Sequence, residues 1–422
     1  MTAIRHHSGS RRDGALPAAE APDASPASFA SSPLHWRFLV ALALLLALAL
    51  AAYALHGQGQ AALSLSLVFG AILGIVLQRS RFCFLCNFRD WLDNGDPRGL
   101  IGIIVALAVG AAGYTVVFGA WLPDASSGRL PPDAFIGPVG LALVAAGLAF
   151  GTGMAISGSC VSAHLYRLGE GSPTAPFALI GTAAGFMLGF ATWNGIYLSV
   201  VSGAPTIWLP RWLGYAGALC AALAALALIA FVLIRFSRKQ PIPVSHENVW
   251  RKVCVDRWPA WIGGAIVGVL GTAAYLRVGP LGVTAEIGGR AREAASALGV
   301  APLRLEGLDT LRGCITLVRD ALLTNNGVFI GALVAASFAA ALTAGQFKPA
   351  WPTAGQIARG LTGGILLGWG AMTGLGCTVG TLLSGVMAGA ASGWVFGAAV
   401  FAGIAASFSV ARFANSLHDR SR

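Results

Sequence analysis

Long apolar stretches recur along the whole chain, and they constrain the fold more than any other feature of the sequence. A helix that crosses a bilayer needs about 20 mostly apolar residues, because lipid offers no partners for backbone hydrogen bonds. The sequence therefore predicts an all-α polytopic membrane protein with about ten crossings. The apolar stretches fall at residues 36–56, 63–78, 99–121, 138–157, 175–200, 214–235, 259–276, 327–345, 356–373 and 393–411.

The composition agrees with a chain that lies mostly in lipid. Hydrophobic residues make up 56% of it and charged residues only 11%, against about 25% charged residues in an ordinary soluble domain. This balance excludes a disordered protein and disfavours a soluble one. The count of seven cysteines is odd, and most of them lie inside apolar stretches, which disfavours a secreted disulfide framework.

The basic residues are concentrated at the ends of the apolar stretches and in the gaps between them. The net charge of +11 therefore indicates cytoplasmic loops that face anionic lipid, and no nucleic-acid partner is predicted. Arginine and lysine surround the long polar gap at residues 237–258, and arginines also occur in the first 34 residues and at the chain end. Both termini are accordingly predicted to be cytoplasmic.

Two glycine and cysteine patterns occur twice, once in each half of the chain. The pattern G-x3-G-x-G-x6-C ends at Cys160 and again at Cys377, an offset of 217 residues. Each is preceded by an R-x-C segment, which ends at Cys83 in the first half and at Cys314 in the second. Together with the loop charges, this self-similarity predicts two repeats of opposite orientation, the architecture of many secondary transporters. A duplicated packing scaffold is the alternative.

The repeat divides the chain into segments. The predicted organisation is a disordered cytoplasmic tail at 1–34, an extra N-terminal transmembrane helix at 35–57, a first transport repeat at 63–236, a basic cytoplasmic linker at 237–258, a second, inverted repeat at 259–412 and a cytoplasmic tail at 413–422.

Glycine and small hydroxyl residues crowd the chain just before Cys160 and Cys377, within spans that would otherwise be continuous. They predict broken or re-entrant helices, which lipid tolerates only where the backbone is buried in protein or lines a cavity. A half-helix that restarts at each cysteine would direct its positive N-terminal end at the break, which suits an anion. The residues expected to line the path beside the thiols are Gly158, Ser159, Gly376 and Thr378.

The cysteines at these breaks have two chemical uses. A thiol can become a reactive thiolate, or it can stay protonated and donate weakly to a polarizable sulfur atom. The second use suits transport, since passage needs a row of weak sites. We expect Cys83, Cys160 and Cys377 to form such a row, with Cys314 as a fourth member. Free cysteine also packs as a small hydrophobe, which is the interpretation for Cys220 and Cys254.

Charged residues next to the first two thiol segments are further candidates, because ionisable groups within a membrane are functional by default. Arg89 and Asp90 are expected to form a buried pair, whereas Arg79 and Arg98 are expected to extend to the interface. The remaining supporting candidates are Arg81, Arg167 and Glu170.

The stretch from residue 278 to 326 is too polar to cross the membrane. By its position in the repeat, it is expected to contain an amphipathic interfacial helix and then a short re-entrant helix around Cys314. Thr284 and Glu286 are expected to line the entrance.

At these residues the sequence resembles the YeeE/YedE family of bacterial inner-membrane sulfur transporters. The resemblance rests on R-S-R-F-C-F-L-C-N-F-R-D at 79–90, S-G-S-C at 157–160 followed by L-Y-R-L-G-E-G at 165–171, G-V-T-A-E-I at 282–287 and G-L-G-C-T-V-G at 374–380.

The resemblance implies an hourglass-shaped inverted repeat in the inner membrane that takes up thiosulfate or a related sulfur anion. It implies that three thiols, Cys83, Cys160 and Cys377, hand the ion on through S–H to sulfur hydrogen bonds. It also implies a TusA-like sulfur-carrier protein as a cytoplasmic partner. Cys86 and Cys314 depart from the family pattern, and they leave open a selenium compound as the substrate.

The leading interpretation is a transporter that is not an enzyme and has no ATP-binding motif, no cofactor and no metal. The chief alternative is a membrane thiol-disulfide oxidoreductase that uses the C-x-x-C pair Cys83 and Cys86. A structural or docking protein, in which the cysteines are replaceable, is the third.

Overall fold

The computed structural model describes residues 36–238, 249–302, 304–308 and 323–420, and in this part of the chain the regular elements are helices. Nine of the described helices are long and apolar enough to cross a membrane, and a tenth crossing is formed if α13 and the bent segment after it count as one span. The prediction of an all-α polytopic membrane protein is confirmed. The predicted tail at 1–34 and Cys314 lie outside the described residues.

Every predicted apolar stretch corresponds to a long helix. These helices are α1 (Trp36–Gly57), α2 (Ala61–Ser80), α4 (Arg98–Trp121), α5 (Leu141–Ser157), α7 (Ala175–Ile196), α8 (Pro210–Arg235), α10 (Ala260–Arg277), α12 (Asn325–Thr343), α13 (Ala354–Thr373) and α15 (Ala391–Arg420). The shorter elements are α3 (Phe84–Asn94), α6 (Val161–Gly169), η1 (Tyr197–Val201), α9 (Val249–Cys254), α11 (Ala285–Ala297), η2 (Thr378–Ser384) and α14 (Gly385–Met387), of which η1 and η2 are π-helical.

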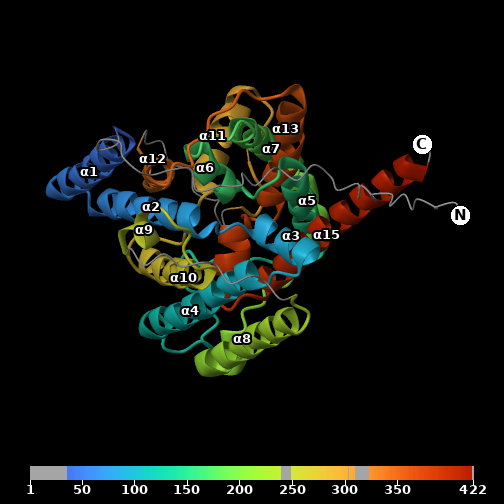
Figure 1. Cartoon of the computed structure of the whole chain (residues 1–422). Coiled ribbons are helices and arrows are strands. Elements are labelled where there is room, and N and C mark those ends of the chain that lie inside the picture. Colours follow the sequence, from blue (N-terminus) through green and yellow to red (C-terminus); the bar gives the residue numbers. More distant parts are fainter. Residues whose placement is uncertain (1–35, 239–248, 303, 309–322, 421–422) are drawn as a thin grey trace, which may run out of the picture.

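The long helices pair across the two halves of the sequence. Helix α2 packs on α12 and α10 packs on α4, while α13 packs on both α5 and α7, and α15 packs on α5. Figure 1 shows α12 next to α2, and α10 next to α4, with α8 at the edge of the bundle. Helices α1 and α8 expose most of their apolar side chains, as expected for helices that face lipid.

Glycines permit the close approach of these pairs. A Cβ atom at Gly151 of α5 would lie 2.1 Å from the carbonyl oxygen of Val400 in α15. A Cβ at Gly368 of α13 would lie 2.0 Å from the carbonyl oxygen of Thr182 in α7. The backbones therefore touch at positions where any larger residue would force them apart, which is how small residues drive helix association in membranes.

The contact between α5 and α13 consists of two equivalent close approaches of the backbones. A Cβ at Gly153 would lie 2.7 Å from the carbonyl oxygen of Gly363, and one at Gly370 would lie 2.7 Å from the carbonyl oxygen of Ala146. Residues 153 and 370 are 217 apart, and so are 146 and 363. The offset that relates the two sequence motifs therefore also relates both partners of this contact.

Candidate functional site: three cysteines at helix breaks

Three cysteines each stand at the start of a short helical segment. Cys83 precedes α3, Cys160 precedes α6 and Cys377 precedes η2. Their exposed fractions are 0%, 0% and 1%, so all three are buried in the main core. The predicted breaks before Cys160 and Cys377 are confirmed, and Cys83 has the same position. The first amide N–H groups of such segments lack helical partners, and the local dipole favours an anion.

The chain turns in the same way before each of these cysteines. The residue two positions earlier has a left-handed backbone in all three cases: Arg81 with φ 48°, Gly158 with φ 87° and Leu375 with φ 58°. For a residue other than glycine this conformation costs roughly 1–2 kcal/mol. The turn ends one helix and starts the next at a new angle, and α13 and the segment after it differ in direction by 44°.

The breaks bring the thiols together. The Cys83 thiol is a neighbour of the thiols of Cys160 and Cys86, and its sulfur accepts from the Cys86 amide at 3.5 Å. Cys160 is also 3.2 Å from the Ser162 hydroxyl, measured from Sγ to Oγ. Cys377 is close enough to Cys160 for an electrostatic interaction. The structure therefore places Cys83, Cys160 and Cys377, predicted from sequence as a row, in one region.

Buried hydroxyl groups without hydrogen-bond partners flank the second and third thiols. Ser159 precedes Cys160 and Thr378 follows Cys377, and neither hydroxyl is paired. Thr284, at the start of α11, has a buried hydroxyl whose neighbour is the Cys377 thiol. Leaving a buried polar group unpaired costs about 1–3 kcal/mol. These groups are therefore available to donate to an anion that reaches the thiols.

The glycines of the breaks have steric roles. Gly158 supplies the left-handed turn before Cys160. A Cβ atom at Gly376 would lie 2.6 Å from the Thr381 hydroxyl oxygen. That hydroxyl donates to the carbonyl oxygen of Gly374 at 3.0 Å and so fixes the turn.

Polar side chains surround the thiols at the end of α6. Arg167 donates from Nη2 to the Cys86 sulfur at 3.2 Å and from Nη1 to the Gly158 carbonyl oxygen at 3.4 Å. Glu170 accepts from the Gln78 side-chain amide at 3.4 Å. Arg81 is exposed but interacts electrostatically with Glu170. The C-x-x-C spacing predicted only a redox pair of Cys86 with Cys83, and the contact of Cys86 with Arg167 is visible only in the folded chain.

The expected buried pair of Arg89 and Asp90 is wrong. Both side chains are partly exposed, and no ion pair joins them in the part of the chain that the structure describes. They are consecutive residues of α3, and consecutive positions of a helix do not face each other.

The expectation that Arg79 extends to the interface is also wrong. Its exposed fraction is 3%, and Nη2 donates to the Ala340 carbonyl oxygen at 2.7 Å. Nη1 donates to the Val255 carbonyl oxygen at 3.3 Å. The Ala340 carbonyl, in the last turn of α12, also accepts from the Ala344 amide at 3.2 Å. Arg79 is therefore an additional donor that joins the end of α2 to the end of α12.

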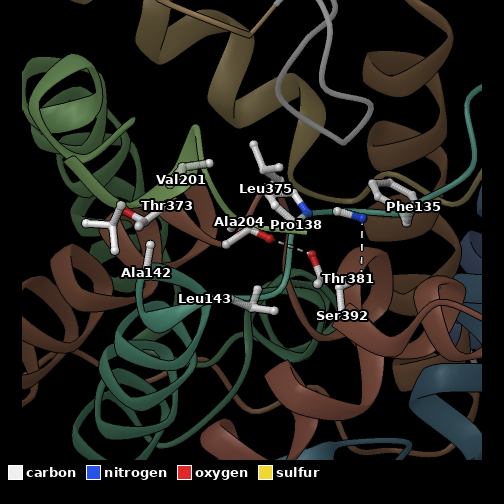
Figure 2. A pocket seen from close by; sticks show the side chains of 14 residues that line it. Phe135, Pro138, Ala142, Leu143, Val201, Ala204, Thr373, Leu375, Thr381 and Ser392 are labelled. Atoms are coloured by element: carbon white, nitrogen blue, oxygen red, sulfur yellow. Dashed lines mark hydrogen bonds between the residues drawn. The ribbon is translucent and has the colours of Figure 1, made fainter. Parts of the chain in front are cut away.

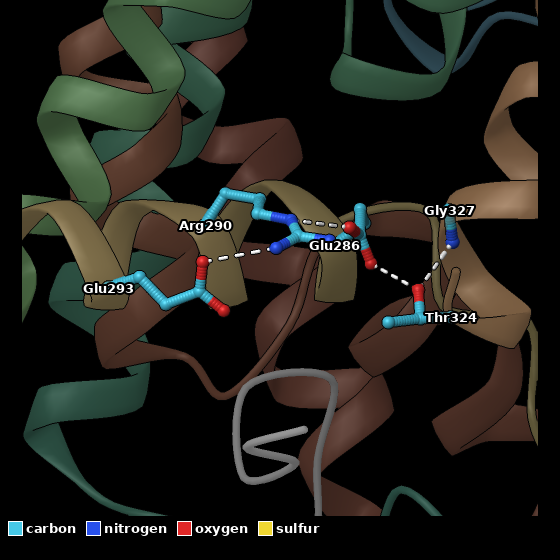
Figure 3. A network of polar contacts seen from close by, with 5 residues as sticks. All are labelled: Glu286, Arg290, Glu293, Thr324 and Gly327. Carbon is cyan, nitrogen blue, oxygen red and sulfur yellow. Dashed lines mark hydrogen bonds and ion pairs between the residues drawn. The ribbon is translucent and has the colours of Figure 1, made fainter. Parts of the chain in front are cut away.

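The predicted amphipathic helix in the long polar stretch is present as α11. Glu286, in its first turn, accepts from the Thr324 hydroxyl and from Arg290 Nε, the latter at 2.9 Å (Figure 3). The Thr324 oxygen in turn accepts from the Gly327 amide at 2.8 Å and so begins α12. Glu286 therefore ties the start of α11 to the start of α12. The predicted re-entrant helix around Cys314 lies outside the described residues.

A pocket of about 460 Å³ lies on one side of the break in α13. Its walls come from four distant parts of the chain, and Leu375, two residues before Cys377, is among the lining residues (Figure 2). Thr373, whose buried hydroxyl has no partner, also lines it. No local sequence pattern could have revealed this pocket, because its walls meet only in the folded chain.

The chain is similar in sequence to several known proteins. A family model described as sulphur transport matches residues 79–406. The thiosulfate transporter TsuA of Spirochaeta thermophila is 30% identical over 360 residues, which cover 78% of this chain and 93% of that protein. TsuA of Escherichia coli is 26% identical over 349 residues, 78% of this chain and 89% of that protein. The probable transporter YedE of Salmonella typhimurium is 25% identical over 188 residues, 44% of each chain.

Proposed function

Because the chain belongs to the sulphur transport family, and is thus a transporter and not an enzyme, we propose that it imports thiosulfate or a related sulfur-containing anion across the bacterial inner membrane. The resemblance to YeeE/YedE proteins is confirmed by the family match and by the relatives. Two of those relatives are named thiosulfate transporters. That name supports thiosulfate as the substrate here, with a selenium analogue as the alternative.

The observation that carries the proposal is the series of buried thiols at helix starts. Cys83, Cys160 and Cys377 each carry a buried thiol, and each is followed by the amide groups of a new helical segment. A thiol is a weak donor with affinity for a polarizable sulfur atom, and the unpaired hydroxyls of Ser159 and Thr378 add donors for oxygen atoms. Contacts of this strength hold a dianion and also release it, as conduction requires.

The path is proposed to lie between two repeats of opposite orientation. Support comes from the contacts of α5 with α13, whose partners are related by one 217-residue offset. Further support comes from helix contacts between the two proposed repeats. Helix α2 of the first repeat packs on α12 of the second, and α10 of the second packs on α4 of the first. In such folds the substrate site lies near the midplane, between the repeats. Both termini would then be cytoplasmic.

A cytoplasmic sulfur-carrier protein of the TusA type is the proposed recipient of the imported sulfur. The resemblance to the family supports this partner, and the polar side chains of Arg167 and Glu170 at the end of α6 would mark the exit. A pull-down with purified TusA-like protein on membranes that contain the transporter tests the contact.

Thiol-disulfide exchange by Cys83 and Cys86 is the competing function. The hydrogen-bonding reach between the two thiols favours it, although both are free thiols in the structure. It requires that a disulfide form between them during turnover.

A growth experiment separates these functions. Cells without thiosulfate uptake of their own receive the wild type, Cys160→Ala, Cys377→Ala or Cys86→Ala, with thiosulfate as the sole sulfur source. The transporter predicts growth with the wild type and none with Cys160→Ala or Cys377→Ala. Growth that survives both substitutions and is lost only with Cys86→Ala would support the redox function instead.

A further inference from the structure

Cys86 extends the row of thiols by one position. It lies on the first turn of α3, and its amide N–H points back to the Cys83 sulfur at 3.5 Å. Its own thiol is within hydrogen-bonding reach of the Cys83 thiol. Cys86 is therefore placed to contact a sulfur atom that is bound at Cys83.

Cys86 differs from the other thiols because it contacts a cation. Arg167 Nη2 is 3.2 Å from its sulfur, and Nη1 is 3.4 Å from the Gly158 carbonyl oxygen. The guanidinium thus joins the break before Cys160 to the start of α3. A thiol is a weak acceptor, and guanidinium groups prefer two oxygen atoms of an oxyanion. An oxyanion would therefore replace the thiol as the partner of Arg167.

We propose that Cys86 and Arg167 form an additional binding site for the transported anion, beyond the Cys83 and Cys160 thiols. This inference rests on the proposed function. The ligand class is a dianion with an oxyanion end, held by the guanidinium, and a polarizable sulfur end, held by the Cys86 thiol. Thiosulfate has both ends, whereas sulfate has only the first.

Glu170 keeps this site from binding too tightly. It lies one turn after Arg167 near the end of α6, and the two side chains interact electrostatically. Arg81 and Arg257 also interact electrostatically with Glu170. The partial neutralisation of Arg167 weakens its hold on a dianion, which favours release.

The first test measures uptake of radiolabelled thiosulfate by variants present in equal amounts in the membrane. Arg167→Gln keeps an amide that can still donate to Gly158. It is expected to raise the KM for thiosulfate about tenfold or more, because the variant loses one charge-assisted hydrogen bond to the anion. Arg167→Lys keeps the charge and is expected to recover part of the loss. Cys86→Ala is expected to raise KM about threefold, with Cys86→Ser no better, because the serine lacks a sulfur atom.

The second test measures alkylation of Cys86 in the purified full-length protein by mass spectrometry. Thiosulfate is expected to slow the reaction of Cys86 but not of Cys254, and sulfate is expected to protect less. Protection is expected to be lost in Arg167→Gln. Unchanged KM for both Cys86→Ala and Arg167→Gln, with no protection by thiosulfate, would overturn the site.

The two proposals fail in different ways. If Cys160→Ala abolishes uptake while Cys86→Ala and Arg167→Gln behave as the wild type, the transport function stands and the additional site is wrong. If uptake does not depend on Cys160 or on Cys377, the thiol path itself is wrong.

Discussion

The thiols of Cys83 and Cys160 are neighbours in the core, although the two residues are 77 positions apart in the chain. Both are N-cap residues of short helices that follow left-handed turns. Two helix starts thus converge from different spans, and each contributes a thiol and the N-terminal amide groups of a short helix. The meeting of these two residues is the geometric basis of the proposed path.

The close contact of α13 with α7 predicts that Gly368 cannot be enlarged. In Gly368→Ala the new Cβ would lie 2.0 Å from the Thr182 carbonyl oxygen, so the helices must separate, at a cost of about 1–3 kcal/mol. Thermal unfolding in detergent measures the loss. Gly331→Ala in α12 is the matched control, because its Cβ would meet nothing within 4 Å. Equal stability of the two variants would contradict the packing described here.

The buried position of Arg79 predicts a structural role for it. Arg79→Gln removes the hydrogen bonds that a buried cation donates to the Ala340 and Val255 carbonyls, and a hydrogen bond from a charged group contributes about 1.5–3 kcal/mol. Chemical unfolding is the measurement. Arg98→Gln is the control, since Arg98 is half exposed and its ion pair with Asp96 lies at the surface, where such a pair contributes about 0–1 kcal/mol. A larger effect of Arg98→Gln than of Arg79→Gln would contradict the assignment.

The link between α11 and α12 depends on the Thr324 hydroxyl. Thr324→Val removes both the N-cap contact to Gly327 and the hydrogen bond to Glu286, at a cost of about 1 kcal/mol. Hydrogen exchange of the amides in the first turns of α11 and α12 is expected to become about fivefold faster. Thr324→Ser keeps the hydroxyl and serves as the control. Exchange that is unchanged in Thr324→Val would show that other contacts hold α11.

Substitution by serine tests whether the thiols act through sulfur. Cys160→Ser and Cys377→Ser keep a donor of similar size but remove the polarizable atom, so uptake of thiosulfate is expected to fall about tenfold. Cys254→Ser, in α9 away from the thiol row, is the control and is expected to transport normally. Normal uptake by Cys160→Ser would mean that a hydroxyl suffices and that sulfur contacts are dispensable.

The spans and the breaks were predictable from the sequence, because each depends on a local run of residues. The apolar stretches marked the long helices, and glycine followed by a cysteine marked the starts of α6 and η2. The helix α11 was predicted within residues 278–326 from the position of that stretch in the repeat, and its bounds came from the structure.

The contacts between spans were not predictable, because they depend on which helix faces which. An arginine at the end of an apolar stretch is typical of the membrane interface. Arg79 is buried instead because α12 packs beside α2 and offers it the Ala340 carbonyl. The partnership of Arg167 with Cys86 joins α6 to α3 across 81 residues. The pocket beside Leu375 likewise exists only where distant segments meet.

The most direct test of the account is the initial rate of thiosulfate uptake into proteoliposomes that contain the purified protein. The wild type is compared with Cys160→Ala and with Cys220→Ala, whose cysteine is exposed on α8. The account predicts uptake by the wild type, an equal rate with Cys220→Ala, and a rate with Cys160→Ala that is lower by about a hundredfold. Uptake by Cys160→Ala at the wild-type rate would contradict it.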